Sequence, residues 1–461
     1  MARIELKDFN LGGESESMLQ GNNNSLYRIV GFDLHKEPGI LSVGDVIGDY
    51  TITGTTSLSK VIKTASNKVY YFFEDKVYEN TTLLHTFVSS GYKNAIMYGG
   101  YVYYVNQNYL GRATDISDSG TYDDTWVTLT GSNNGDIPME VVENTLYVHC
   151  GDRIATVDST GTFSANVLDL PIDSVYYPGL VKYGSDLLIG CTTIYGNQKS
   201  VIYRWDRFSE NLLNEVNIPD LAIHSMFNYK GIPLISAGYS GNIYMYNGSG
   251  LPLFKKLENR MIISPNCSME LGDELLLGVS VVGGDGTTIP GIYSLKASNV
   301  GYPTVLSLKH SIPNYSLYQG DYYIDAIGFY LSNLDDPQTL AFAAKSNTFH
   351  PIKVSNPTYK SSNSYIETKI LKVDRAEQNT FKIKIAYKSY LQGVGQSINV
   401  YSSVNYAAYG SAMEATIDVD RNIVEFTQEV PGATTVQFKV EVTTSGSSET
   451  APEIESIIID Y

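Results

Sequence analysis

Residues 99–113 read Gly99-Gly100-Tyr101-Val102-Tyr103-Tyr104-Val105-Asn106-Gln107-Asn108-Tyr109-Leu110-Gly111-Arg112-Ala113. An apolar run, a short polar turn and a second apolar run predict two antiparallel strands joined by a tight turn. The first run recurs, usually after a polar or glycine pair, at Val69, Val102, Leu146, Leu187, Pro233, Leu275 and Tyr322. The spacing averages about 42 residues, which is the period typical of β-propeller blades.

A second apolar run follows each copy of the first, with the markers Val77-Tyr78, Leu110, Ile154, Ile202-Tyr203, Ile243-Tyr244, Ile292-Tyr293 and Leu340. Blades that pack face to face around an axis remove this apolar surface from water. The seven copies therefore predict an all-β fold with a β-propeller of about seven blades over residues 49–350. Six or eight blades remain open, because the first unit is short and ring closure often borrows a distant strand. A pair of β-sandwiches with accidental regularity is the alternative.

The repeat stops near residue 350, where Pro351, Pro357 and the polar run 360–364 predict a linker. Strict alternation of apolar and polar residues then begins, for example at Phe381 and Val436. Seven such runs predict a C-terminal β-sandwich over residues 351–461, which would serve binding or packing. The runs cover 365–373, 381–388, 397–404, 415–420, 423–430, 436–442 and 454–461.

Residues 1–48 do not fit the blade pattern. They join short apolar anchors by polar, glycine-rich links such as Gly21-Asn22-Asn23-Asn24-Ser25. We expect an extended N-terminal arm and no separate folded domain. Such an arm lies on a neighbouring subunit, closes a ring, or packs on its own propeller.

The composition excludes several classes of protein. The chain has 461 residues, with 37 Tyr, 40 Gly and only 18% charged residues, which argues against a helical bundle, a coiled coil or disorder. The 32 basic and 49 acidic residues give a net charge of −17, so sequence-specific nucleic-acid binding and an acidic membrane surface are poor expectations.

The compartment signals favour a protein made in cytoplasm. The sequence starts without a basic stretch followed by an apolar run, so we expect no secretory signal, and no run is long enough for membrane insertion. The three cysteines, Cys150, Cys191 and Cys267, are far apart. We expect three reduced, packed thiols.

No catalytic or metal-binding constellation stands out. The histidines His35, His85, His149, His224, His310 and His350 are widely separated, so no ligand pair is visible and packed or surface histidines are expected. His149 and Cys150 should point to opposite faces of one strand. No nucleophile elbow, phosphate loop or dinucleotide fingerprint occurs, and Gly283 to Gly286 is typical of a blade-tip turn.

One acidic loop contains the residue type that binds calcium. Asp115, Asp118, Asp123 and Asp124 lie close in sequence, but they lack EF-hand spacing, so a solvated loop is favoured over calcium. The segment Ser117 to Thr121 departs from the Asp-box turn of sialidases and has no second copy. We therefore expect no catalytic, cofactor-binding or metal-binding residues. Most tyrosines should pack between blades, and a minority on loops should contact partners.

The arm carries a family resemblance in two segments. They are Asp8-Phe9-Asn10-Leu11-Gly12-Gly13 and Ile29-Val30-Gly31-Phe32-Asp33-Leu34-His35-Lys36-Glu37-Pro38-Gly39-Ile40-Leu41. They resemble the opening of tail-associated propeller proteins of bacteriophages, and the layout of the whole chain resembles podovirus tail hub or nozzle subunits. The resemblance implies a structural protein of the virion tail that assembles as a homo-oligomeric ring with other tail proteins. It implies no catalytic residues.

The sequence is compatible with two functions of different classes. The first is a non-catalytic bacteriophage tail subunit, located in the virion and made in the bacterial host cytoplasm. The alternative is a carbohydrate-binding or polysaccharide-degrading propeller that recognises a host surface glycan. The propeller hosts many functions, so fold alone does not choose between them.

Overall fold

The computed structural model describes residues 3–9, 26–34, 36–37, 39–50, 57–64, 68–88, 91–114, 120–129, 137–171, 175–193, 199–284, 288–297, 304–311, 320–329, 340–346, 352–373, 380–388, 395–445 and 450–461. Within these ranges the elements with assigned bounds are all strands, β1 to β40. The expectation of an all-β fold is confirmed. Across the described ranges, no helix combines the length and apolarity that crossing a membrane requires.

Five separate sheets of four antiparallel strands follow one another along the chain. In order they are β6 (Leu58–Lys63), β7 (Val69–Phe73), β8 (Lys76–Glu79) and β9 (Thr82–Thr86); β10 (Tyr92–Tyr98), β11 (Tyr101–Asn106), β12 (Tyr109–Ala113) and β13 (Tyr122–Thr128); β14 (Met139–Val142), β15 (Thr145–Cys150), β16 (Arg153–Asp158) and β17 (Phe163–Asp169); β18 (Val175–Tyr183), β19 (Asp186–Thr193), β20 (Ser200–Trp205) and β21 (Asn214–Ile218); and β22 (Ile223–Tyr229), β23 (Ile232–Ala237), β24 (Asn242–Met245) and β25 (Leu253–Lys256).

Two further groups of four strands lie within a larger sheet. One consists of β26 (Met261–Leu271), β27 (Glu274–Gly284), β28 (Gly291–Ala297) and β29 (Thr304–Ser311). The other consists of β30 (Gly320–Phe329), β31 (Leu340–Ser346), β32 (Ile352–Lys360) and β5 (Asp45–Tyr50). The fourth strand of the last group therefore comes from near the N-terminus.

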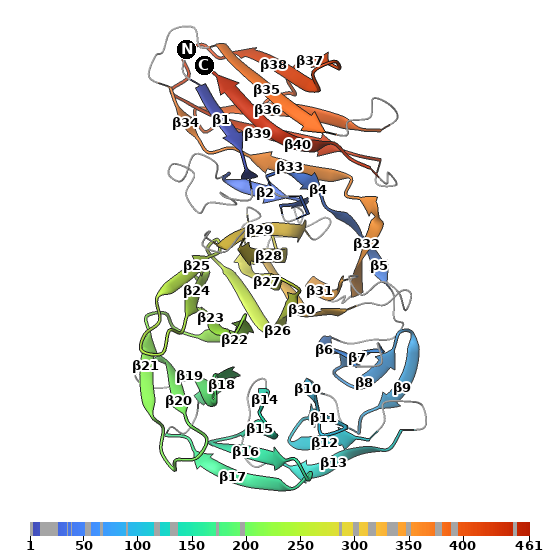
Figure 1. Cartoon of the computed structure of the whole chain (residues 1–461), viewed down its shortest axis with the longest axis vertical. Helices are drawn as coiled ribbons and strands as arrows, with labels where there is room; N and C mark the ends of the chain where they lie inside the picture. The colour runs from blue at the N-terminus through green and yellow to red at the C-terminus, as the bar shows by residue number, and fades with distance from the viewer. Residues whose placement is uncertain are drawn as a thin grey trace.

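The first strands of the seven groups form a closed cycle. Contacts run from β6 to β10, β14, β18, β22, β26 and β30, and β30 contacts β6 again. Figure 1 shows the groups arranged around a common centre, with these strands innermost. The chain therefore contains a β-propeller, and we call each group of four strands a blade.

The cores of the propeller lie between successive blades. One cluster joins the first two blades through Phe72 and Tyr104, and another joins the third and fourth through Tyr147 and Trp205. The second strand of a blade is covered on both faces, so β7 and β19 are buried at every position. This explains why the second strands appear in the sequence as continuous apolar runs rather than alternating ones.

The seventh copy of the repeat differs from the prediction. In six blades the first apolar run is the second strand, but the run at Tyr322 lies in the first strand, β30. The marker at Leu340 then begins the second strand, β31. Apolar content alone does not distinguish an inner strand from the strand beside it, which explains the shift.

The expected linker after residue 350 is instead the strand β32. Pro357 lies within it, at a break in register between Asn356 and Lys360. Because the ladder is interrupted there, the missing N–H of proline removes no regular hydrogen bond. The strands therefore do not follow the expected boundaries, since β32 lies beyond residue 350 and β5 spans residue 48.

The seven C-terminal runs all contain strands. They are β33 (Asn363–Glu367) with β34 (Leu371–Lys372), β35 (Thr380–Lys388), β36 (Ser397–Val404), β37 (Ala415–Asp418), β38 (Ile423–Glu429), β39 (Thr435–Thr443) and β40 (Glu453–Asp460). One sheet has the order β1-β40-β35-β38-β37, and β39 pairs with β33, β34 and β36 in the larger sheet. Both sets of strands contribute to one apolar core that includes Phe381 and Phe438.

The described residues of the predicted N-terminal arm pack into this same core. The strands of the arm are β1 (Arg3–Lys7), β2 (Arg28–Val30), β3 (Phe32–Asp33) and β4 (Ser42–Val43). β1 pairs with β40, and the side chains of Phe9, Phe32 and Leu41 are fully buried among C-terminal residues. We call the described residues of 361–461, together with those of 3–43 other than the strand β2, the C-terminal module. Most of the described arm thus lies on its own chain, against the C-terminal strands.

One strand of the arm joins the two parts of the molecule. β2 pairs in parallel with β29 of the sixth blade and antiparallel with β33 of the C-terminal module. Ion pairs reinforce this junction: Arg28 Nη2 lies 3.2 Å from Glu258 Oε1 of the propeller, and Arg28 Nη1 lies 3.7 Å from Glu367 Oε2 of the module. The propeller and the module are therefore joined by main-chain pairing and by charge.

Candidate functional site

The inner strands of the propeller are irregular where they pass the central axis. β6, β10, β18, β22, β26 and β30 each have a break in register against the second strand of the same blade. The largest lies between Ile263 and Ser268 of β26. A β-bulge redirects the side chains around it, and several residues within or beside these bulges, including Lys60, Asn94 and Asn266, face the axis.

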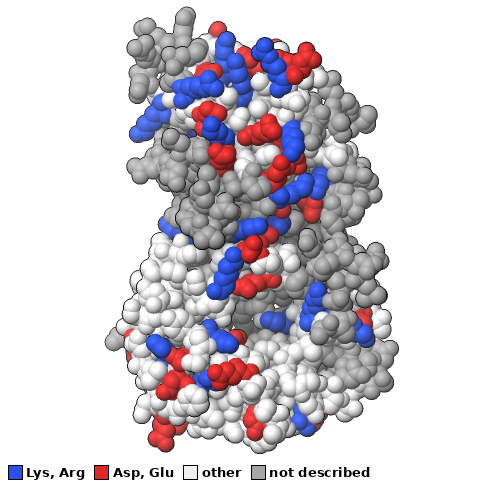
Figure 2. Space-filling view, viewed as in Figure 1, with Lys and Arg blue, Asp and Glu red and all other residues white. Residues whose placement is uncertain are grey.

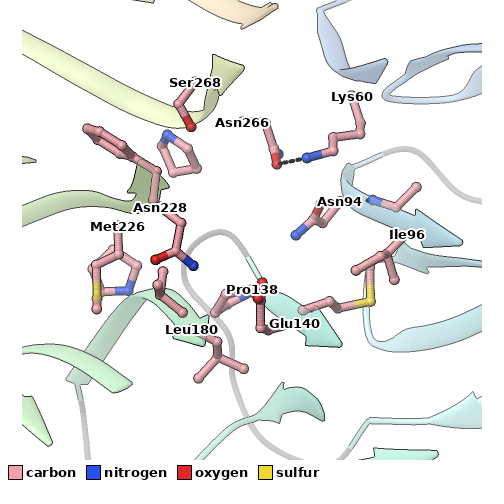
Figure 3. Close-up of a pocket in the computed structure, with 17 residues that line it drawn as sticks. Lys60, Asn94, Ile96, Pro138, Glu140, Leu180, Met226, Asn228, Asn266 and Ser268 are labelled. Carbon is pink, nitrogen blue, oxygen red and sulfur yellow. Dashed lines mark hydrogen bonds between the residues drawn. The ribbon is translucent and has the colours of Figure 1, made fainter. Parts of the chain in front are cut away.

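A cavity of about 320 Å³ lies where these residues converge. Six inner strands and the residues beside them line it (Figure 3), and the molecular surface is hollowed near the centre of the ring (Figure 2). Its polar lining includes one basic residue, Lys60, one acidic residue, Glu140, and several side-chain amides. Its apolar lining includes Ile96, Leu180 and Met226. We call it the axial cavity.

Lys60 enters the axial cavity from the first blade. Its Nζ donates a hydrogen bond to Asn266 Oδ1 at 2.8 Å, and Asn266 Nδ2 in turn donates to the carbonyl of Ser59 at 3.2 Å. Asn266 has a φ of 61°, a left-handed conformation that asparagine tolerates better than most residues. Burial lowers the pKa of the Lys60 ammonium, and the negative charge of Glu140 only partly opposes this effect.

Glu140 enters the cavity from the third blade. Burial raises its pKa to about 7, although the backbone N–H of Lys182 and the charges of Lys60 and Lys182 favour the carboxylate. No lysine or arginine nitrogen in the described part of the chain lies within ion-pair distance of this carboxylate. The two opposite charges of the cavity therefore attract each other without touching.

Two more amides complete the polar lining. Asn94 Nδ2 donates to the carbonyl of Ile137 at 3.2 Å, and Asn228 Nδ2 donates to the carbonyl of Lys182 at 3.2 Å. Asn228 Oδ1 is buried and accepts no hydrogen bond from the described residues. Buried acceptors are normally satisfied, so this oxygen has capacity for another donor. The cavity can therefore hold a small polar molecule by hydrogen bonds and charge.

The four described histidines occupy three different settings. His85 Nε2 lies 3.0 Å from Asp124 Oδ1, His224 Nε2 contacts the carbonyl of Gly238 at 3.1 Å, and both His149 and His310 are buried in strands. Burial lowers the pKa of His149 to about 4 and that of His310 to about 3. His35 and His350 lie outside the described residues. No group of three potential metal-ligating side chains occurs within the described ranges.

The acidic loop divides into two parts. Asp115, Asp118 and the start of the Ser117 to Thr121 segment lie outside the described residues, while Asp123 and Asp124 lie on β13. Asp123 is exposed and Asp124 is buried, as expected for adjacent strand residues. Asp124 accepts hydrogen bonds from Tyr104 Oη at 2.6 Å and from the N–H of Val88 at 2.8 Å. It therefore connects the first two blades.

Other sequence predictions can be located directly. Cys150, Cys191 and Cys267 are buried thiols, which confirms the expected packing of the three side chains. Gly283 lies near the end of strand β27 with a left-handed φ of 63°, and Asp285 and Gly286 of the expected turn lie outside the described residues. Tyr71, Tyr103 and Tyr104 are among the largest fully buried side chains, in line with tyrosine packing within the propeller.

The sequence did not single out the residues of the axial cavity. Lys60 and Glu140 are two of many charged residues, and each precedes an apolar second strand by a different interval. The bulges make these intervals irregular, so no fixed spacing marks the residues that face the axis. The available signal was a polar residue in the inner strand of several repeats. Recognising it requires knowing which residues of each repeat form the inner strand.

A second concave region lies in the C-terminal module beside the junction. It has a volume of about 450 Å³, and its lining includes Tyr27, Arg28, Glu367, Tyr406 and Tyr409. Tyr406 is 68% exposed and has a φ of 64°. A bulky residue rarely adopts this conformation. We call this region the junction groove.

No protein-family model matches the chain, and no curated protein matches it. Among solved structures, the extracellular domain of the putative hybrid two component system BT4673 from B. thetaiotaomicron shares 13% identity at a TM-score of 0.46, covering 70% of this chain and 41% of that chain. The Dos1 propeller shares 12% identity at a TM-score of 0.42, covering 76% of this chain and 93% of that chain. The N-terminal domain of Nup159 shares 12% identity at a TM-score of 0.41, covering 68% of this chain and 96% of that chain. The chain thus spans less than half of the first of these proteins, and none of the three similarities bears on activity.

Proposed function

We propose that this chain is a structural subunit of a bacteriophage tail, similar to hub or nozzle proteins, that acts through protein–protein contacts and without catalysis. In this proposal the chain has an N-terminal arm, a seven-bladed propeller and a C-terminal β-sandwich. It belongs to the virion tail, is made in the host cytoplasm and forms a homo-oligomeric ring with other tail proteins as neighbours. Neither sequence-specific nucleic-acid binding nor membrane insertion is part of the proposal.

The observation that carries the proposal is the position of β2 between the two parts of the molecule. Domains joined only by a linker usually move relative to one another. Here β2 extends the sheet of the sixth blade into the C-terminal module. Lys309 Nζ adds a contact near this junction, 3.3 Å from Asp33 Oδ2 of the arm and 3.0 Å from Glu274 Oε2 of the propeller. A subunit of a tail must transmit force between its neighbours, and fixed modules suit that task.

The oligomeric state of the full-length chain tests this proposal. Native mass spectrometry over a range of concentrations, together with electron microscopy, should give a closed ring with one fixed number of copies. A chain that stays monomeric at every concentration and in the presence of neighbouring tail proteins would contradict the proposal.

The junction groove favours a second candidate function, carbohydrate binding. Its tyrosines offer amphipathic ring surfaces, and Arg28 and Glu367 offer charged hydrogen-bonding groups beside them. Retention of the protein on host polysaccharide should then fall strongly for Tyr406→Ala. Tyr239→Ala is the matched control, because Tyr239 is 56% exposed on the propeller and does not line the groove. Equal retention of both variants and the wild type would exclude the groove as the glycan site.

A further inference from the structure

The axial cavity brings together two opposite charges, Lys60 and Glu140, neither of which has a charged partner at contact distance among the described residues. Lys60 Nζ makes its one hydrogen bond within the described residues to a neutral amide oxygen, Asn266 Oδ1. An ammonium group has three donors, so two remain for another molecule. The Glu140 carboxylate accepts the backbone N–H of Lys182 and has acceptor capacity left.

The two charges lie on opposite sides of the cavity. In Figure 3, Lys60 and Asn266 lie together at the top, while Glu140 lies below them and Asn228 to their left. Asn228 Oδ1, which accepts no hydrogen bond within the described ranges, belongs to this second group. One side of the cavity therefore offers donors from an ammonium group, and the other offers acceptors.

This distribution matches one class of small molecule. Charges removed from water are costly unless they are paired, so a ligand that pairs both at once gains more than a ligand that pairs one. A free α-amino acid has a carboxylate for Lys60 and an ammonium group for Glu140 and Asn228 Oδ1. A neutral sugar would satisfy hydrogen bonds but would leave both charges unpaired.

The size and the apolar wall of the cavity further restrict the class of amino acid that can bind. A volume of about 320 Å³ is near the lower limit of ligand pockets, which suits one amino acid rather than a peptide. Ile96, Leu180 and Met226 form an apolar wall that suits an aliphatic side chain. We propose that the axial cavity binds a free aliphatic α-amino acid, with its carboxylate on Lys60 and its ammonium group on Glu140. This inference does not depend on the proposed tail function.

Calorimetric titration of the full-length protein with the twenty free L-amino acids tests the proposal. At least one aliphatic amino acid should bind with a stoichiometry of one per chain. Its methyl ester, which lacks the negative charge, and its N-acetyl derivative, which lacks the positive charge, should each bind at least about tenfold more weakly. These probes need no mutation, so they test the proposal even if a variant fails to fold.

Three variants then assign the contacts. Lys60→Met and Glu140→Gln should each weaken binding of the free amino acid by about tenfold or more. Lys199→Met is the matched control, because Lys199 is an exposed lysine that pairs with Glu215 at the outer edge of the fourth blade. The proposal is overturned if no amino acid binds the wild type. It is also overturned if the ester and N-acetyl derivatives bind as well as the free amino acid, or if Lys60→Met and Glu140→Gln match the control.

Discussion

The propeller and the C-terminal module are both built from strands, but they assemble their cores differently. In the propeller, each of five clusters centres on two successive blades, so its residues are mostly near one another in sequence. In the C-terminal module, one core combines Leu6 and Phe9 from the beginning of the chain with Ile457 and Ile459 from its end. Local pairing therefore suffices for a blade, whereas the module requires both ends of the chain.

The two regions also differ in surface charge. Figure 2 shows Lys, Arg, Asp and Glu side chains of both signs crowded over the C-terminal module, while much of the described propeller surface in this view is uncharged. Some of these charges fasten the arm: Lys388 Nζ lies 2.7 Å from Glu37 Oε1, and Lys36 Nζ lies 3.3 Å from Glu453 Oε1. Exposed pairs of this kind contribute little individually, so the apolar core must provide most of the attachment.

The largest effect is expected from Phe381→Ala in the core of the C-terminal module. Phe381 is fully buried and its ring lies 5.4 Å from Phe438 and 5.6 Å from Tyr461, measured between centroids. Truncation should cost about 3–5 kcal/mol in the free energy of unfolding. Because the core includes the arm, hydrogen exchange should accelerate in β1 as well as in β35.

Phe208→Ala is the control for this variant, since Phe208 is 81% exposed on the propeller. Its unfolding free energy should stay within about 0.5 kcal/mol of the wild type. If Phe381→Ala accelerates exchange in β35 but leaves β1 fully protected, the arm and the C-terminal strands do not share one core.

A smaller effect is expected where the seventh blade meets the first. A Cβ added at Gly328 would lie 2.3 Å from Val61 Cβ, so the inner strands β30 and β6 would have to separate. Gly328→Ala should cost about 1–3 kcal/mol through overpacking. Gly250→Ala is the control, because its added Cβ would meet nothing closer than 3.8 Å. Denaturant unfolding of both variants compares the two costs, and equal stability would place the ring closure elsewhere.

The contrast between the propeller and the C-terminal module also explains which parts of the fold the sequence could predict. The blades were predictable because second strands such as β7 and β11 are continuous apolar runs within short hairpins. The C-terminal strands were predictable because positions such as Phe381 and Ile383 alternate with polar neighbours. The partners of β2 and β5 were not predictable, since pairing with residues hundreds of positions away leaves no local pattern. The axial cavity was missed for a related reason: Lys60 and Glu140 come from different blades and face the same cavity only once the ring has closed.

Asp124→Asn should have a moderate effect on the contact between the first and second blades. Burial alone would raise the pKa of Asp124, but hydrogen bonds from His85, Tyr104 and the N–H of Val88 lower it below the usual 3.8. The loss of a charged acceptor should cost about 1–3 kcal/mol at neutral pH. A carboxyl with a depressed pKa stabilises the fold above its ordinary pKa and loses that contribution as the pH falls through the depressed value.

Urea unfolding at pH 7 and near pH 3 checks this prediction. The difference between the wild type and Asp124→Asn should be largest at pH 7 and should shrink at the acidic pH. A difference that is independent of pH would show that the ionised carboxylate is not what connects the two blades.

The smallest effect near neutral pH concerns His310, which lies on β29 beside the junction. Burial and, to a lesser extent, the charge of Lys309 lower its pKa to about 3, although Asp33 acts in the opposite direction. The folded state therefore favours neutral histidine. The contribution of His310 to the free energy of unfolding is complete above pH 6.5 and is lost as the pH falls from 6.5 toward 3. One unit below 6.5, this loss should be about 1 kcal/mol. His310→Gln should flatten the stability profile in this window, and an unchanged slope would exclude His310 as its source.

The central claim is that a strand from near the N-terminus completes the seventh blade, while the arm joins the propeller to the C-terminal module. Hydrogen exchange of the peptide that contains β5 tests this claim most directly, because β5 pairs with β32 from Asp45 to Tyr50. The account predicts that amides of β5 exchange as slowly as those of β31 and β32. Rapid exchange of β5, with protection retained in the other blades, would contradict it.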